Sequence, residues 1–587
     1  MQILLDAVAD DLQAALASVG VEGDLWRRVI GPARERKEGD VALPCFPFAK
    51  MVGRAPADIA EAVAAAMQGH EALSEVRATN GYLNLVANPA WLAAQLLDEA
   101  GPLSAPVAPE DGLVLIEHTS ANPNGPFHVG RARNAILGDT LVRLNRLAGR
   151  NVRAEYYVDD MGKQVGVLAW ALANLSEADV SEALSDRADA DSTWAHKPDH
   201  ARVRWYQAAQ AIRSAQEGTP EGQVIEDDIG RMVHASEHGD EAVLEAFEAA
   251  YTPVLEGMLE TLGRLGITFD AFTKESTFVV DGSVADIMDR LATLDIHGEA
   301  DNGARFLDLG QRGLKGKTEF FYRRGDGSSL YATRDLAYHR WKWTQADRLL
   351  NVLGEDHRLQ AKQVGMTLSE LGAEAPEVVF YSFIKLPEGK MSTRRGNVVF
   401  MDDLLEEAKA QAASVVRDLR PEYDEAQIDA ISEAVATSAV RFNIIKVSPE
   451  KGFTFTWEEA LSFEGGSAPF AMYAHTRACS IARNLEAAEP ATEAPSFEGE
   501  MPDGLVDLLR VLAVHPDVLR NAVQQHKPHL FALHMLDLAN AYNGFYRDCP
   551  VIVGGRAHAL HAAVSERARE VLHAGLTGLG LVPLERM

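Results

Sequence analysis

The sequence predicts an α/β protein in which a parallel-sheet domain lies between an α/β N-terminal domain and an all-α C-terminal helix bundle. Three observations predict this organisation. Residues 105–400 alternate short apolar runs, typical of buried strands, with helix-like segments, as a parallel sheet does. Residues 1–104 mix the two kinds of segment in a smaller unit. From residue 401 onward the apolar residues recur almost entirely at helical spacing.

Composition excludes several classes of protein. A length of 587 residues suits three or four domains. A net charge of −30 argues against indiscriminate binding of polyanions, so nucleic acid would have to bind at local patches. No apolar run approaches the ~20 residues that span a bilayer, and residues 1–20 lack the basic start of a secretory signal. Cys45, Cys479 and Cys549 are far apart, which predicts a cytoplasmic protein with small buried thiols and no structural metal.

The N-terminal domain carries an aromatic and an amide side chain on one predicted strand. Tyr82 and Asn84 could stack on and hydrogen-bond to an unpaired base. The alternative is that Tyr82 is an ordinary half-buried strand residue. Three prolines in residues 102–112 predict the linker to the next domain. The expected elements are helices at 1–20, 56–68 and 89–100 and a strand at 81–86.

The sheet domain is organised around its first strand, turn and helix. Residues 113–116 form a short apolar strand, 122–126 are turn residues, and 128–147 have helical spacing. His128 and Gly130 then lie at a helix N-terminus, where free N–H groups and the helix dipole attract phosphate. His128 and Arg131 can donate to phosphate oxygens, and Gly130 lets a base or ribose approach. The alternative is ordinary helix-start chemistry.

Three further features of this domain follow in chain order. A second strand at 152–158 ends in the polar residues 159–164, and carboxylates at such a strand end are where open α/β sheets place ligand contacts. Residues 168–272 are polar and helical, which predicts an insertion into the sheet. Strand signals return at 278–280, 304–309 and 318–322.

A cationic loop follows the apolar run at residues 378–383. It reads Lys-Met-Ser-Thr-Arg-Arg-Gly-Asn over residues 390–397. Such a loop suits reaching over a polyphosphate and neutralising charge that develops in a transition state. The alternative is a solvated basic loop without a ligand.

The last part of the chain reads as connecting helices at 401–460 and a helix bundle at 461–587. Aromatic and amide side chains on the bundle could stack on and hydrogen-bond to unpaired bases. The alternative is that most of these aromatic residues pack between helices. The expected helices are 402–419, 428–447, 468–485, 505–514, 516–525, 529–547 and 557–576. The candidate RNA contacts are Tyr473, His475, Arg477, Asn540, Tyr542, Asn543 and Tyr546.

The two candidate phosphate-binding stretches, in this order, resemble the HIGH and KMSKS signatures of class I aminoacyl-tRNA synthetases; here they read HVGR and KMSTR. Residues 354–357 resemble the GxDH element that precedes the second signature. Within the class the chain most resembles the arginyl-tRNA synthetase family, on residues 120–131, 331–335 and 517–520, the last echoing the DALR motif of its anticodon-binding domain. The resemblance covers essentially the whole chain.

The resemblance implies a Rossmann-type catalytic domain that acts in two steps. ATP and L-arginine give arginyl-adenylate and pyrophosphate, with Mg²⁺ on the phosphates, and the arginyl group then passes to the terminal ribose of tRNA(Arg). It also implies that the N-terminal domain contacts the tRNA and that the helix bundle binds the anticodon. We expect a monomer that does not bind a membrane.

The resemblance assigns roles to residues at matching positions. The catalytic group comprises His128, Arg131, Lys390, Arg394 and Arg395. The ATP-binding group comprises Pro126, Phe127, His128, Gly130, Arg131, Asn134, Gly354, Asp356, His357, Lys390, Met391 and Ser392. The arginine-binding group comprises Glu117, Ser120, Asn122, Tyr331, Asp335 and Glu355. The tRNA-binding group comprises Tyr82, Asn84, Tyr473, Arg477, Asn543 and Tyr546.

Selection of arginine needs a carboxylate that faces a guanidinium, and Glu117 and Asp335 are the candidates. Asp335 lies four residues after Tyr331, hence on the same helix face. The alternative for Asp335 is a salt bridge to Arg334 or Arg340. Family members often carry a Gln near the position of Glu355, and no Gln aligns there.

The chain departs from the family pattern in both signatures. Arg131 replaces the second His of the first, and Thr393 replaces the second Lys of the second, so Arg394, Arg395 or another segment must supply that charge. Asn124 stands where some members carry a lysine. The alternatives are a cysteinyl enzyme, which should show Cys/His zinc spacing, a glutamyl enzyme, which should present basic groups to its substrate, and an inactive relative that only binds RNA.

Overall fold

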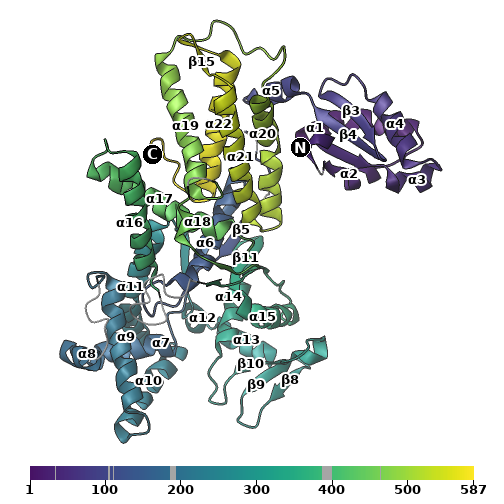
Figure 1. The fold of residues 1–587 in the computed structure, drawn as a ribbon. Helices are drawn as coiled ribbons and strands as arrows, with labels where there is room; N and C mark the ends of the chain where they lie inside the picture. The colour runs from purple at the N-terminus through teal and green to yellow at the C-terminus, as the bar shows by residue number, and fades with distance from the viewer. Residues whose placement is uncertain (34, 104–105, 110–111, 186–192, 386–398, 463–464) are drawn as a thin grey trace. The chain divides into compact units, whose positions relative to one another are not determined.

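The computed structural model of the chain describes all residues except 34, 104–105, 110–111, 186–192, 386–398 and 463–464. The described residues form two compact units (Figure 1). One unit contains residues 1–108, 462–577 and 582–587, and the other contains residues 109–461 and 578–581.

The second unit is built on a five-stranded sheet in the order β12-β11-β5-β6-β7, with every neighbouring pair parallel. The strands predicted at 113–116 and 152–158 are confirmed. Apolar residues of β5 and β11 pack against Leu137 and Leu141 of helix α6 (Val129–Leu147). The strands are β5 (Leu113–Glu117), β6 (Asn151–Val158), β7 (Ala271–Lys274), β11 (Arg348–Gly354) and β12 (Glu377–Tyr381).

The described residues between β6 and β7 are mainly helical, and their helices pack around Val167, Trp170 and Ile229. Ser176 caps α8, accepting a hydrogen bond from Asp179 N while the Asp179 carboxylate accepts one from Ser176 N. The helices are α7 (Lys163–Asn174), α8 (Glu177–Ala183), α9 (Pro198–Ala215), α10 (Pro220–Glu237) and α11 (Glu241–Arg264).

The strand predicted at 278–280 is wrong, because these residues form helix α12 (Thr277–Val280). The run is apolar and β-branched, but the backbone and side chain of Ser276 donate to the Asp160 carboxylate and turn the chain there. Phe278 then points into a hydrophobic core, so packing overrides strand propensity. The other two predicted strands exist in a separate antiparallel sheet. That sheet contains β8 (His297–Glu299), β9 (Arg305–Asp308) and β10 (Glu319–Arg323).

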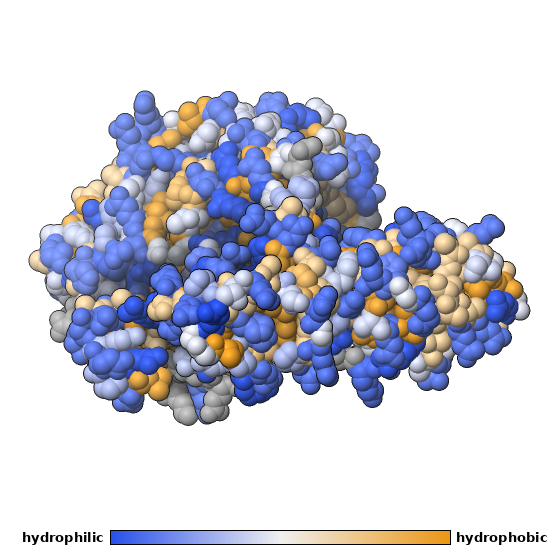
Figure 2. Space-filling model, turned by 90° about the horizontal axis from the view of Figure 1, so that it is seen from above, coloured by the Kyte–Doolittle hydropathy of each residue, from blue (hydrophilic) through white to orange (hydrophobic). Residues whose placement is uncertain are grey.

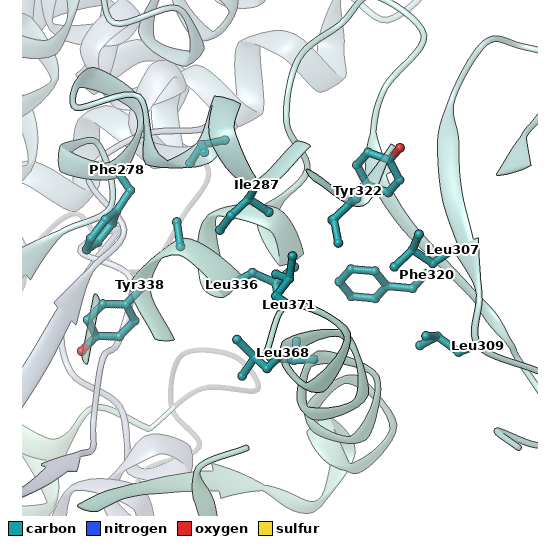
Figure 3. Packing of buried hydrophobic residues seen from close by; sticks show 14 of the residues in the cluster. Phe278, Ile287, Leu307, Leu309, Phe320, Tyr322, Leu336, Tyr338, Leu368 and Leu371 are labelled. Atoms are coloured by element: carbon teal, nitrogen blue, oxygen red, sulfur yellow. The ribbon is translucent and has the colours of Figure 1, made fainter. Parts of the chain in front are cut away.

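A hydrophobic core fixes α14 (Tyr331–Gln345) between this small sheet and its neighbouring helices (Figure 3). Leu336 of α14 contributes to it with Ile287 of α13 (Ser283–Leu291) and Leu368 of α15 (Arg358–Glu370). With one side of α14 held in the core, Tyr331 and Asp335 remain free to line a cavity on another side.

The connecting helices are α16 (Met401–Leu419) and α17 (Glu425–Ile445), followed by the short α18 (Trp457–Ala460). Asp424 and Gln427 form a capping box at the start of α17. The two-residue strands β13 (Ile384–Lys385) and β14 (Phe453–Thr454) flank α16 and α17 in the chain and pair in parallel.

The first unit contains an antiparallel sheet in the order β1-β2-β4-β3 and the helix bundle. The elements predicted at 1–20, 56–68, 81–86 and 89–100 are confirmed with shifts of a few residues at their ends. The strands are β1 (Gly31–Pro32), β2 (Val41–Pro44), β3 (Leu73–Thr79) and β4 (Tyr82–Ala87). The helices are α1 (Gln2–Ser18), α2 (Leu25–Val29), α3 (Phe46–Val52), α4 (Pro56–Ala66) and α5 (Pro89–Leu97).

In the bundle, the two helices predicted at 505–514 and 516–525 are one helix, α20 (Asp503–Gln524). The helix continues through Pro516 because Leu512 and Leu519 extend the same buried face on both sides. The other bundle elements are α19 (Ala468–Ala487), α21 (Pro528–Asp548), β15 (Ile552–Val553), β16 (Arg556–Ala557) and α22 (Ala559–Gly578).

The distribution of buried and exposed residues agrees with what the composition predicts. All three cysteines are buried and free, as predicted. On the face seen in Figure 2, hydrophobic residues are scattered among a mostly hydrophilic surface. None of the helices in the described ranges combines the length and the apolar character that crossing a membrane requires.

Candidate active site

A cavity of about 560 Å³ lies at the carboxyl ends of β5, β6 and β11, where open α/β sheets bind their ligands. It gathers residues that are far apart in the sequence. Those predicted from the sequence are Glu117, Ser120, Asn122, His128, Gly130, Arg131, Asn134, Tyr331, Asp335, Gly354, Asp356 and His357.

Other predicted residues lie outside the cavity wall. Pro126 and Phe127 are buried, and Glu355 accepts a hydrogen bond from Ser382 Oγ at 2.7 Å. The cationic loop lies outside the described residues. The predicted residues in it are Lys390, Met391, Ser392, Arg394 and Arg395.

The turn after β5 holds two residues in left-handed backbone conformations. Thr119 has φ +67° and Ser120 has φ +36°, which are uncommon for side chains with a Cβ and cluster at functional sites. Asn134 Oδ1 accepts from Thr119 N at 2.7 Å, and Asn134 Nδ2 donates to Val352 O at 3.0 Å. Ser120 Oγ donates to Glu117 Oε1 at 3.1 Å. Asn134 therefore holds the turn against β11.

Gly138 of α6 packs directly against this turn. A Cβ at residue 138 would overlap the Cβ and Cγ of His118. We expect Gly138→Ala to lower the free energy of unfolding in urea by about 1–3 kcal/mol, the usual cost of overpacking. Gly263→Ala is the matched control, because an added Cβ there meets nothing within 4 Å. Equal effects of the two substitutions would show that the contact with His118 carries no constraint.

The start of α6 is joined to the chain that follows the cationic loop. Val129 N donates to Val399 O at 3.0 Å, and Met401 N donates to Phe127 O at 2.8 Å. Burial, helped by the charge of Arg131, lowers the pKa of His128 to about 4, so at neutral pH its imidazole donates through one N–H. Arg131 Nη1 donates to Asn122 O at 3.3 Å.

Both candidate carboxylates line the cavity, each with a partner. Glu117 Oε2 accepts from Lys342 Nζ at 2.6 Å. Asp335 Oδ1 lies 3.1 Å from His339 Nδ1. Burial acts to raise the pKa of Asp335, but His339, Lys342 and His357 nearby bring it below its ordinary value. Asp335 is therefore ionised at neutral pH.

The alternative partners proposed for Asp335 are wrong. Arg334 pairs with Glu275 at 2.8 Å, and Arg340 pairs with Asp286 at 3.1 Å. Asp335 remains directed at the cavity.

The cavity also contains residues that the sequence did not assign to a site. Gln360, in the first turn of α15, is a Gln five residues after Glu355 that lines the cavity. Asp159 directly follows β6 and lies at the strand end where an open α/β sheet was expected to place ligand contacts. Burial raises the pKa of Asp159 and of its neighbour Glu275. The cavity is also lined by three residues that no sequence motif marked: Tyr157, His339 and Asn351.

One buried cluster has the composition of a metal site but does not fit one. The potential ligands in Asp199, His200 and Asp402 lie within 4.8 Å of one another. Lys197 Nζ lies among them, 2.8 Å from Asp402 Oδ2. This ammonium supplies the positive charge that a cation would bring.

Four predicted RNA contacts form one group in the helix bundle. The Arg477 guanidinium lies 4.6 Å from the Tyr473 ring centre and 5.1 Å from that of Tyr546. Arg477 Nη1 also donates to Asn543 Oδ1 at 2.6 Å. This combination of stacked rings and a cation is typical of sites that bind unpaired bases.

The remaining candidate RNA contacts differ in how far their side chains are exposed. His475 and Tyr542 are fully buried between helices, so the packing interpretation holds for them. Asn84 is only 5% exposed, on a central strand. Tyr82 is half-buried and packs edge-on against Phe46, with ring centres 5.3 Å apart.

Three family models cover most of the chain. The class I (R) tRNA synthetase catalytic domain matches residues 94–457, the DALR anticodon binding domain matches 471–587, and the arginyl tRNA synthetase N terminal domain matches 6–87.

Relatives and solved structures agree with these models. An arginine–tRNA ligase of Methanocella arvoryzae is 40% identical, over 94% of this chain and 95% of its own. One of Halorubrum lacusprofundi is 37% identical over 99% of both chains. The structure of Thermus thermophilus arginyl-tRNA synthetase matches 99% of this chain and 100% of its own, with TM-score 0.79 and 26% identity. These matches set aside the cysteinyl and glutamyl alternatives. The chain belongs to the arginyl-tRNA synthetase family of class I aminoacyl-tRNA synthetases.

Proposed function

We propose that the cavity carries out the arginine–tRNA ligase reaction of this family. One observation carries the proposal: a helix start suited to phosphate, with His128 and Arg131, lies in the same cavity as Glu117 and Asp335, two carboxylates suited to a guanidinium. ATP and arginine would thus meet at the ends of the strands.

Arginine would bind with its two ends apart. The guanidinium faces Asp335, Tyr331 and Glu117, and the α-amino and carboxylate end faces Ser120 and Asn122. The α-carboxylate attacks the α-phosphorus of ATP, and pyrophosphate leaves. This step needs positioned charge more than a covalent nucleophile.

ATP would lie over the start of α6. Gly130 allows close approach of the nucleotide, His128 and Arg131 donate to phosphate, and residues 354–357 border the same space. Residues 399 and 401, which follow the cationic loop in the chain, hydrogen-bond to residues 129 and 127 on either side of His128. This supports a role for residues 390–395 at the phosphates. Mg²⁺ enters with ATP as its substrate complex and neutralises phosphate charge.

The Arg477 group is proposed to contact the tRNA anticodon, and Tyr82 to contact the tRNA body. We expect Arg477→Ala to weaken tRNA(Arg) binding by about 5- to 100-fold, the range for losing a base-stacking contact. Arg547→Ala removes the same charge from an exposed position on α21 and is the control. Filter binding measures both variants, and equal losses would reduce the role of Arg477 to net charge.

The test of the function is ATP–pyrophosphate exchange with each amino acid, with and without tRNA(Arg). Exchange with arginine alone is expected. A requirement for tRNA would indicate that tRNA completes the site, whereas exchange without it would remove that coupling. Silence in both conditions, with tRNA binding intact, would favour the inactive RNA-binding alternative.

The buried free thiols support a cytoplasmic location. The monomeric state stays a prediction, which light scattering can test.

A further inference from the structure

A continuous row of hydrogen-bonded side chains joins the two carboxylates of the cavity. Lys342 Nζ lies 2.6 Å from Glu117 Oε2 and 3.0 Å from Asn351 Oδ1. Asn351 Nδ2 lies 2.8 Å from His339 Nε2. His339 Nδ1 lies 2.8 Å from the backbone oxygen and 3.1 Å from the Oδ1 of Asp335. The row therefore runs from one carboxylate to the other without a gap.

Donor and acceptor chemistry allows one assignment of protons along this row. The Lys342 ammonium only donates, so Asn351 presents its oxygen to it and its NH₂ to His339. His339 Nε2 must then accept, which leaves the imidazole neutral with its proton on Nδ1, directed at Asp335. All three linking side chains are buried, with exposed fractions of 4% or less.

Local structure explains how the row is built. Asp335, His339 and Lys342 recur at four and three residues along α14, which places them on one face of the helix. Asn351 reaches them from the neighbouring strand β11. Lys342 also lies 4.3 Å from the ring centre of Tyr338, which further shields its charge.

The row sets the charge of the two carboxylates that it joins. Glu117 and Asp335 each carry a negative charge, Lys342 cancels one of them, and neutral His339 and Asn351 add none. One negative charge remains on the row itself, which matches the single positive charge of a guanidinium.

We propose that Lys342, Asn351 and His339 are positioning residues that orient Glu117 and Asp335 and make the cavity specific for a cationic side chain. This inference rests on the proposed function. It assigns the uncompensated charge to Asp335, while Glu117 is held by Lys342 and Ser120.

The test uses substitutions of His339 in the full chain, assayed by pyrophosphate exchange with tRNA present. His339→Leu removes both links and is expected to raise the KM for arginine by about 10- to 100-fold, the value of a hydrogen bond to a charged group, with the KM for ATP unchanged. His339→Asn places an amide near the Nδ1 position and should restore most of the affinity. Citrulline is the neutral isostere of arginine and should inhibit the wild-type protein weakly. In His339→Leu, the ratio of the affinity for citrulline to the affinity for arginine should be higher than in the wild type.

Two comparisons decide the outcome. Arg340→Gln, which removes an exposed ion pair on the same helix, is the control and should keep the wild-type KM. If His339→Leu matches that control, the row has no role in arginine binding. If His339→Leu does not fold, His339→Gln replaces it. This variant keeps an acceptor for Asn351 but loses the donor to Asp335. An arginine KM equal to that of His339→Asn would then overturn the proposal. Wild-type protein without arginine-dependent exchange would instead refute the proposed function.

Discussion

Asp335→Asn is expected to raise the KM for arginine by about 100- to 1000-fold, because it removes one partner of a buried charge pair. Asp335 is the carboxylate whose charge no ammonium cancels directly, whereas Glu117 already contacts Lys342 Nζ at 2.6 Å. The asparagine has nearly the same shape and its Oδ1 can still accept from His339. The loss should therefore appear in arginine binding and not in folding.

Pyrophosphate exchange with tRNA present measures this effect, and the thermal unfolding midpoint confirms that the variant is folded. Asp286→Asn is the matched control, since Asp286 pairs with Arg340 near the same helix at a partly exposed position. A variant at residue 335 with the wild-type KM for arginine would place the guanidinium elsewhere in the cavity.

The features that could be predicted from the sequence are local ones. An apolar run, a turn and a helical pattern placed β5, His128 and the start of α6 within a residue or two of their observed positions. The four-residue spacing of Tyr331 and Asp335 was likewise enough to place both on one face at the start of a helix, and the family resemblance, not the spacing, assigned them to arginine.

The features that escaped prediction depend on contacts between distant parts of the chain. Lys342 meets Glu117 across 225 residues, and no spacing rule connects the two. Thr119 takes a left-handed conformation that its β-branched side chain disfavours, because Asn134 holds it there. The wrongly predicted strand at 278–280 has the same origin. Packing of Phe278 in the hydrophobic core, and not the local strand propensity, determines the conformation of these residues.

Arg441→Met is expected to lower the free energy of unfolding by about 3–5 kcal/mol, the cost of breaking a buried ion pair. Arg441, in α17, is fully buried. Its Nη2 lies 2.6 Å from Asp139 Oδ2, its Nη1 lies 2.8 Å from Leu265 O, and its Nε lies 3.2 Å from Leu579 O. Methionine fills much of the volume but leaves these acceptors unpaired, with Asp139 keeping only the contact to Arg143 among its ion pairs in the described part of the chain.

Urea unfolding of the full chain measures this loss, and Arg417→Met is the control. Arg417, on α16, makes an exposed pair with Glu425, so its removal should change the free energy by no more than about 0.5 kcal/mol. Because Asp139 lies on α6, loosening it should also disturb His128 and Arg131 at the start of that helix. We therefore expect the arginine-dependent exchange rate of Arg441→Met to fall below that of Arg417→Met well under the unfolding temperature. Equal stability of the two variants would show that packing alone, and not this ion pair, joins α17 to α6.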